Sequence, residues 1–305
     1  MDRKFHTADV FTDRLFGGNP LAVIPDGEGI DDARMQLIAR EFNLSETVFV
    51  LPPEDSAHAA RLRIFTPRAE LPFAGHPTVG AAIVLAAIGR VPLADGAAEI
   101  VLEEGVGPVP VSIRSRDGRP VFAQFTVARL PEEGPEPPSA AALAEMVSLE
   151  PAEVLTGAER PQAFSCGVPF LFLPVKDRAA LSRARMRNDR WEELLSSYWA
   201  PPVFLFCRGA GGDGPDLHAR MFSPKMGIPE DPATGSAVSA LAGYLAQRSD
   251  LRDGTPRWRV AQGEDMGRPS LLELEVDIQA GAVTSVRVGG AAVPVSEGVL
   301  HLPDR

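Results

Sequence analysis

The chain has 305 residues, of which 45% are hydrophobic and 23% are charged, a composition typical of a globular protein in water. This length is generous for one hydrophobic core and suits two domains of about 150 residues each. The formal net charge of -11 argues against a surface that binds nucleic acid or an anionic membrane.

No part of the sequence has the pattern of a targeting or membrane-spanning segment. Residues 1–11 lack the apolar core of a signal peptide. The longest run of small and apolar residues, 79–89, is far below the roughly 20 residues needed to cross a bilayer. Two cysteines are too few for a disulfide scaffold or a four-ligand zinc site. We therefore expect a cytoplasmic protein with no nucleic-acid or membrane partner.

The first half of the chain predicts strands and two helices. Residues 21–25 form a short apolar strand, and the acidic residues 31–32 then open an amphipathic helix that ends near residue 42. An Ala-rich helix is expected over 78–88, where Gly89 ends it. Further strands are expected at 47–51, 62–65, 100–103, 110–113 and 124–127.

The second half repeats this order of elements. Strands are expected at 170–175, 203–207, 218–222, 271–278, 283–289 and 293–302, with helices through 191–195 and over about 234–247. The helices at 78–88 and 234–247 are too apolar all round to lie on a surface, so we expect a sheet to wrap each of them. The predicted fold class is α+β, with two similar lobes that each wrap a mostly antiparallel sheet around a central hydrophobic helix.

The residues themselves also repeat. Residues 63–68 (RIFTPR) are echoed 157 positions later by 220–225 (RMFSPK), and 76–82 are echoed 155 positions later by 231–237. A weaker echo pairs 18–23 with 167–172. The acidic, Pro-rich segment 131–138 near the midpoint is typical of a linker. We predict an N-terminal lobe of 1–130, which the strand at 293–302 could complete, and a C-terminal lobe of 131–305.

The starts of the two apolar helices are candidate binding sites. A helix start carries unpaired backbone N–H groups and a partial positive charge, so it suits a carboxylate. The plainer interpretation is that Thr78 and Thr234 are N-caps and the nearby prolines only start helices. The duplication, with ionisable His76 and Asp231 at matched places, favours a site. The candidate substrate-binding residues are Gly75, Pro77, Thr78, Thr234 and Gly235.

Glu46 is the candidate general acid/base. It precedes the apolar strand 47–51, where burial would disfavour its charged form and suit it to exchange a proton. A solvated glutamate is the alternative. The histidines are scattered without a metal-ligand spacing, and residues 17–20 lack the glycines of a dinucleotide loop. We therefore expect neither a metal ion nor an organic cofactor.

Several of these segments together resemble the phenazine-biosynthesis PhzF-like family, which shares the diaminopimelate epimerase fold. The resemblance is carried by residues 16–20, 43–47, 65–67, 73–78, 230–237, 262–263 and 268–270. It implies a substrate cleft between two lobes. It also implies that Glu46 matches the family's proton-shuttling glutamate, with His76, Asp231 and Ser236 as supporting polar residues. The best-known member isomerises a dihydro-hydroxyanthranilate as a homodimer without any cofactor, so a homodimer is expected here.

Two alanines set this chain apart from the wider fold. Epimerases and racemases that resemble it place a cysteine at each helix start, where this chain has Ala74 and Ala233. Inverting a stereocentre needs opposed groups on two faces, so we predict instead an isomerase that moves a proton on one face of a small carboxylate-bearing metabolite, either dihydroaromatic or an amino or hydroxy acid. Two alternatives stay open. One is a two-base epimerase or racemase, and the other is a non-catalytic protein that binds a small acid.

Overall fold

The computed structural model describes residues 1–303, which form two compact units. The first unit contains Met1–Ala128 and the described residues from Gly289 onward, and the second contains Arg129–Val288. Residues 289–303 thus belong to the first unit. The prediction had assigned 131–305 to the C-terminal lobe and had allowed the strand at 293–302 to complete the first lobe. Residues 304–305 of that predicted lobe lie outside the described residues. Within 1–303, no helix is long and apolar enough to cross a membrane.

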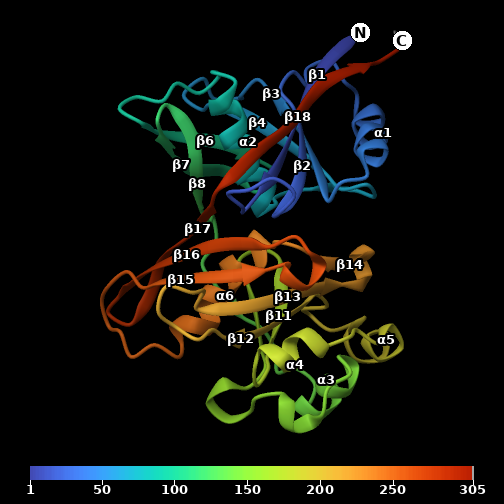
Figure 1. Cartoon of the computed structure of the whole chain (residues 1–305), viewed down its shortest axis with the longest axis vertical. Helices are drawn as coiled ribbons and strands as arrows, with labels where there is room; N and C mark the ends of the chain where they lie inside the picture. Colours follow the sequence, from blue (N-terminus) through green and yellow to red (C-terminus); the bar gives the residue numbers. More distant parts are fainter. Residues whose placement is uncertain (304–305) are drawn as a thin grey trace. The chain divides into compact units, whose positions relative to one another are not determined.

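The first unit is a sheet with two helices. Its helices are α1 (Asp32–Phe42) and α2 (Gly75–Ala87), and its strands are β1 (Asp2–Val10), β2 (Asn19–Ile24), β3 (Glu46–Leu51), β4 (Ala60–Phe65), β5 (Glu70–Leu71), β6 (Ala97–Glu104), β7 (Gly107–Arg116), β8 (Arg119–Thr126) and β18 (Ala292–His301). Figure 1 shows β18 lying along β1, and the two strands pair antiparallel over their whole length. The last strand of the described chain, β18, therefore pairs with the first strand, β1, and completes the sheet of the first unit.

Helix α2 forms the core of this unit. Every residue from Gly75 to Ala86 is buried, and the helix packs against β1, β2, β3, β7, β8 and β18. Gly80 makes this close approach possible, because a Cβ there would lie 2.5 Å from the Leu21 side chain and 2.7 Å from that of Val10. The sheet therefore curves around α2, as its uniformly apolar sequence predicts.

The second unit has the same plan. Its strands are β9 (Glu132–Glu133), β10 (Gln162–Ser165), β11 (Pro169–Pro174), β12 (Val203–Arg208), β13 (Leu217–Ser223), β14 (Ile228–Asp231), β15 (Arg257–Gln262), β16 (Ser270–Gln279) and most of β17 (Ala282–Gly290). Its helices are α3 (Ala140–Met146), α4 (Arg178–Arg183), α5 (Asn188–Leu195) and α6 (Gly235–Ala246). The central α6 packs against β9, β10, β11 and β16 and is buried from Val238 to Leu245. Tyr244 on this helix contacts the rings of Phe164, Phe172 and Phe206.

Strand pairing confirms the internal repeat. In the first unit β1–β2 is antiparallel, β2–β3 parallel, β3–β4 antiparallel, β4–β6 parallel and β6–β7 antiparallel. The series β10, β11, β12, β13, β15 and β16 has the same alternation in the same order. The fold class is α+β, as predicted.

Some expected boundaries were wrong. Helix α2 begins at Gly75 and not at 78, because Ala74 holds the N-cap position with extended backbone although its side chain cannot cap. The N-terminal residues, which carried no predicted element, form β1. The segment expected to be an extended linker contributes β9, which pairs with β10.

Candidate active site

The local fold fixes where Glu46 begins its strand. Helix α1 ends at Phe42, and the N–H of its C-cap residue Asn43 donates to the Ala39 carbonyl at 3.1 Å. The left-handed backbone of Asn43 (φ +51°) then ends the helix. The chain then turns into β3, which lies parallel to β2 with Glu46 opposite Leu21. The next residues of β3 are fully buried, and Glu46 itself is only 7% exposed. A carboxyl group is thus held at the edge of an apolar core.

His76 lies directly against this carboxyl group. It is the second residue of α2 and is 5% exposed, and its Nε2 atom is 2.9 Å from Oε2 of Glu46. The two atoms form a close ion-pair contact, and within residues 1–303 neither of them makes a hydrogen bond. Carboxyl and imidazole groups are the side chains that most often carry general acid/base chemistry. The structure therefore brings together two residues that the sequence separates by 30 positions.

The start of α2 is not capped by a side chain. Ala74 cannot accept a hydrogen bond through its side chain, and the first turn holds no acidic residue among those described. Thr78, one of the candidate N-caps, lies inside the first turn, and its hydroxyl is 2.9 Å from the Ala74 carbonyl. The interpretation of Thr78 as an N-cap is therefore wrong. The first backbone N–H groups of α2 remain available to an anion, as helix starts often are.

In the second unit, Asp231 is held by the residue that precedes α6. It is 7% exposed, and the Thr234 hydroxyl donates to its Oδ2 atom at 2.5 Å. Thr234 occupies the N-cap position, but its side chain makes no capping hydrogen bond within the described chain. Its role is thus to orient Asp231. Ser236 follows in the first turn of α6 and is partly exposed.

Gln262, at the end of β15, completes this arrangement. Its side chain is fully buried, and Nε2 donates to the Asp231 carbonyl at 2.7 Å and to the Thr234 hydroxyl at 2.9 Å. Its Oε1 accepts from the Thr234 N–H at 3.1 Å. Gly263 follows with φ +76°, and a Cβ at this position would lie 2.6 Å from the Pro232 carbonyl. Only glycine lets the two segments approach so closely.

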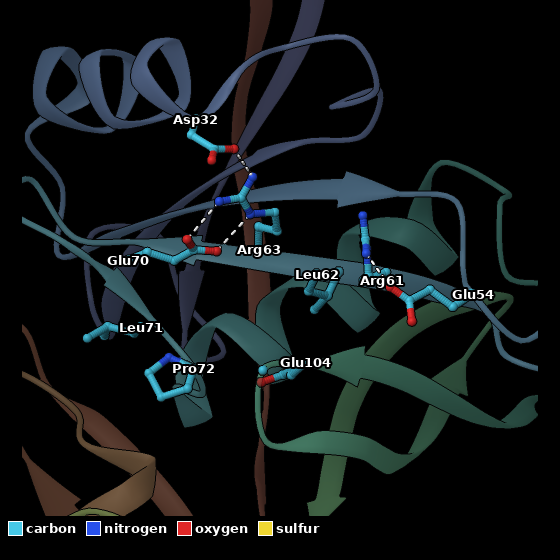
Figure 2. Close-up of a pocket in the computed structure, with 10 residues that line it drawn as sticks. Asp32, Glu54, Arg61, Leu62, Arg63, Glu70, Leu71, Pro72 and Glu104 are labelled. Atoms are coloured by element: carbon cyan, nitrogen blue, oxygen red, sulfur yellow. Dashed lines mark hydrogen bonds and ion pairs between the residues drawn. The ribbon is translucent and has the colours of Figure 1, made fainter.

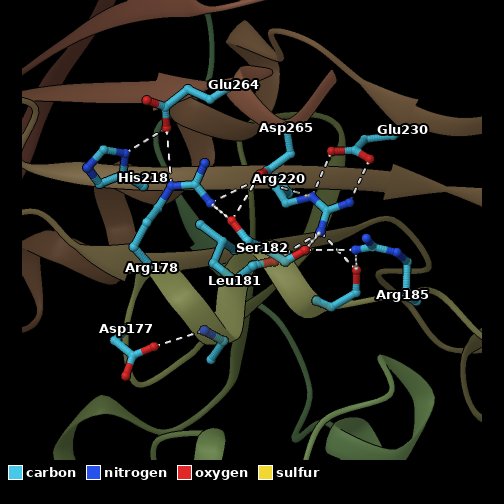
Figure 3. Close-up of polar contacts among 12 residues, drawn as sticks. Asp177, Arg178, Leu181, Ser182, Arg185, His218, Arg220, Glu230, Glu264 and Asp265 are labelled. Atoms are coloured by element: carbon cyan, nitrogen blue, oxygen red, sulfur yellow. Dashed lines mark hydrogen bonds and ion pairs between the residues drawn. The ribbon is translucent and has the colours of Figure 1, made fainter. Parts of the chain in front are cut away.

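Figures 2 and 3 show a matched Arg–Glu pair in each unit. Arg63 donates to both carboxylate oxygens of Glu70 at 2.7 Å, and Arg220 donates to both of Glu230 at 2.8 Å. The pairs hold β5 to β4 and β14 to β13, the strands that lead toward the starts of α2 and α6. Within residues 1–303, no three His, Cys, Asp or Glu side chains gather as they would to hold a metal ion.

Comparison with known proteins matches this geometry to one family. The family model described as phenazine biosynthesis-like protein, PhzC-PhzF, matches residues 8–298. The chain belongs to this family. It is 43% identical over 303 residues to an uncharacterized isomerase of Mesorhizobium japonicum, which covers 98% of this chain and 99% of that one. It is 34% identical over 301 residues to the trans-2,3-dihydro-3-hydroxyanthranilate isomerase of Pseudomonas aeruginosa, with the same two coverages.

Solved structures agree on the fold. The crystal structure of a PhzF-family phenazine biosynthesis protein from Bacillus anthracis superposes with a TM-score of 0.87 at 24% identity, and the match covers 99% of this chain and 100% of that one. The relatives above are named isomerases, so the expected class of enzyme, an isomerase of the PhzF family, is confirmed.

Sequence reasoning missed two polar residues near the helix starts, Gln262 beside the start of α6 and Glu104 beside the start of α2. Gln262 was noticed only as part of a motif, although no local pattern shows which atoms it contacts. Glu104 is a buried carboxyl group whose Oε1 atom is 2.7 Å from the Thr78 hydroxyl. A signal for Glu104 existed, because it lies two residues after the fully buried Leu102, on the same face of β6.

Proposed function

We propose that this PhzF-family protein is a cofactor-independent isomerase that moves a proton on a small carboxylate-bearing metabolite, with Glu46 as general acid/base. The observation that carries the proposal is the contact between Glu46 and His76, 2.9 Å apart and both buried. Ionisable groups are seldom buried for structural reasons without a hydrogen-bonded partner, so a dry carboxyl–imidazole pair favours a chemical role. The relative from Pseudomonas aeruginosa supports a dihydro-hydroxyanthranilate as the substrate to test first.

In this proposal the residues divide the work as follows. Glu46 removes an acidic C–H proton from the substrate and returns it to another carbon of the same conjugated system, so no proton is gained or lost overall. The N–H groups at the start of α2 stabilise the substrate carboxylate or the negative charge that develops on it. His76 relays a proton or orients Glu46. Asp231, Thr234 and Ser236 supply polar groups for the amino or hydroxyl substituents.

Isomerisation is favoured over epimerisation by what precedes each helix. Ala74 and Ala233 are buried methyl groups, and neither can remove a proton. Racemisation would need a second base on the opposite face of the substrate, and among the candidate site residues His76 or Asp231 could supply it. Asp231 already accepts a hydrogen bond from Thr234. A single carboxyl group that takes and returns a proton is the simpler use of these residues.

The test is to incubate the enzyme with trans-2,3-dihydro-3-hydroxyanthranilate in D₂O and follow both the position of the double bonds and the deuterium content. A shift of the double-bond system that depends on Glu46 supports the proposal. Inversion of a stereocentre with solvent deuterium at that carbon would show a two-base epimerase instead. Tight binding without any change in bonding or isotope content would show a binding protein.

A further inference from the structure

Glu104 is a buried carboxyl group that the proposed chemistry does not use. It ends β6, is 7% exposed, and its Oε2 atom makes no hydrogen bond within the described residues. Figure 2 shows it at the wall of a surface pocket of about 620 Å³, close to Pro72. Its only side-chain hydrogen bond there is to Thr78, which lies in the first turn of α2.

The two contacts of the Thr78 hydroxyl indicate the protonation state of Glu104. Its Oγ1 atom is 2.9 Å from the Ala74 carbonyl and 2.7 Å from Oε1 of Glu104. A hydroxyl group has one hydrogen and can donate to only one of these oxygens. The other short contact needs a hydrogen on the partner, and a carbonyl cannot supply it. Both contacts are therefore full two-centre hydrogen bonds only if Glu104 is protonated and donates to Thr78 while Thr78 donates to Ala74.

The surrounding charges agree with a neutral Glu104. Arg114 and Arg116 on β7 lie at the opposite end of that strand from Gly107, the residue that pairs with Glu104. Four other cationic or imidazole side chains lie on the elements around it: Arg61 and Arg63 on β4, His58 before β4, and His76 on α2. Each is already paired with another carboxylate, respectively Glu54, Glu70, Glu103 and Glu46. The remaining charged groups that line the pockets beside Glu104 are the carboxylates Asp32 and Asp55. The cations that line these pockets are thus paired with other carboxylates, and burial raises the pKa of Glu104 to about 8.

We propose that Glu104 is a positioning residue, held as a neutral carboxylic acid, that fixes Thr78 and keeps negative charge away from the anion-binding start of α2. The proposal rests on the proposed function for the meaning of that helix start. An ionised carboxylate bonded to the first turn would oppose a substrate carboxylate there, because it would offset the positive end of the helix dipole. The neutral acid makes the same contact with Thr78 without that repulsion.

The protonation state can be measured directly. In enzyme labelled with ¹³C at the glutamate carboxyl carbons, the resonance of Glu104 is the one that disappears in Glu104→Gln. We expect it to titrate with a midpoint near 8. Thr78→Val deletes the hydroxyl that Glu104 contacts, so it should shift the midpoint of the same resonance. That second variant also identifies the resonance if Glu104→Gln does not fold. A midpoint near 4.3, the ordinary value for glutamate, overturns the proposal.

The effect on binding has a separate readout. As pH rises through that midpoint, we expect the KM of the wild type for trans-2,3-dihydro-3-hydroxyanthranilate to rise roughly two- to five-fold, the size of a charge effect at a helix end. In Glu104→Gln, whose amide can still donate to Thr78, this rise should vanish. An identical rise in both proteins overturns the positioning role. Absence of turnover by the wild type at every pH counts against the proposed function. In that case the carboxyl titration by itself still tests whether Glu104 is protonated.

Discussion

Oε2 of Glu46 and Nε2 of His76 lie 2.9 Å apart, although the two residues come from different elements, the first residue of β3 and the second of α2. Both side chains are more than nine-tenths buried. Their contact depends on the turn at Asn43, which sets where β3 begins, and on the extended Ala74, which lets α2 begin before His76. The pair is thus built by the ends of elements, where a protein can vary chemistry without disturbing its core.

Replacing Glu46 by Gln tests the central role. The amide keeps the size of the side chain and its contact with His76 but cannot take up a proton, so kcat should fall about 10²- to 10⁴-fold while the protein stays folded. Turnover of the dihydro-hydroxyanthranilate and the circular dichroism spectrum are the measurements. Glu41→Gln, on the exposed side of α1, is the matched control and should leave kcat unchanged. Full activity of Glu46→Gln would remove Glu46 from the mechanism.

Replacing Gln262 by Leu tests the hydrogen bonds around Asp231. Leucine fills most of the volume but leaves the Thr234 N–H and the Asp231 carbonyl without the contacts that Gln262 provides, so unfolding should become easier by about 2–4 kcal/mol. All three tryptophans lie in the second unit, so urea unfolding followed by their fluorescence reports on this unit. Gln279→Leu, at an exposed end of β16, is the control. Equal midpoints for the two variants would show that the network adds no stability.

Glu104 predicts a dependence of stability on pH. Its pKa is about 8 in the folded chain and near 4.5 when unfolded, so between these values the folded state holds one more proton than the unfolded state. Stability therefore falls as pH rises through this window, by up to about 1.4 kcal/mol per pH unit. Below this window Glu104 does not affect the stability, and above it the stability lost through Glu104 stays constant. Glu104→Gln removes the contribution, because glutamine does not titrate.

The measurement is the difference in melting temperature between Glu104→Gln and the wild type, followed by circular dichroism across this range of pH. Other titrating groups contribute equally to both proteins and cancel in the difference. The melting temperature of the variant minus that of the wild type should increase steadily from about pH 5 and become constant above about pH 8. A difference that stays constant with pH contradicts a raised pKa at Glu104.

Local patterns were sufficient for much of the fold. The acidic start and basic end of α1 located that helix to within a residue, and the apolar run after Glu46 located β3. The predicted start of α2 was wrong because the N-cap residue, Ala74, has no capping side chain that would mark a helix start in the sequence. The pairing of β1 with β18 joins residues almost 300 positions apart, and no local periodicity carries that information.

The candidate site was predictable only in part. The echo between 76–82 and 231–237 marked both helix starts, because duplication leaves similar residues at similar places. The contact of Glu46 with His76 could not be derived, since it depends on how far α2 reaches along β3. Gln262 and Glu104 act through atoms that meet only after strands pair, so a sequence shows their chemistry but not their partners.

The matched pairs Arg63–Glu70 and Arg220–Glu230 allow the same interaction to be compared at two degrees of burial. The Arg63 side chain is 22% exposed and its partners face solvent, whereas that of Arg220 is 6% exposed. Arg220 also donates to backbone carbonyl groups, among them the buried ones of Leu181 and Ala184. Figure 3 shows Leu181 beside it. Each arginine lies over the ring of a phenylalanine two residues along its strand, at 5.1 and 5.0 Å.

Substituting each arginine by Met keeps the apolar stem and deletes the guanidinium group. We expect Arg220→Met to destabilise the protein by about 3–5 kcal/mol, because Glu230 and two carbonyls lose a buried partner. Arg63→Met should cost about 1 kcal/mol or less, because water can replace its contacts. Urea unfolding of both variants by circular dichroism gives the comparison, and tryptophan fluorescence isolates the second unit. Equal costs would mean that burial does not set the strength of this repeated pair, and that the strand carrying Asp231 is held in place by other contacts.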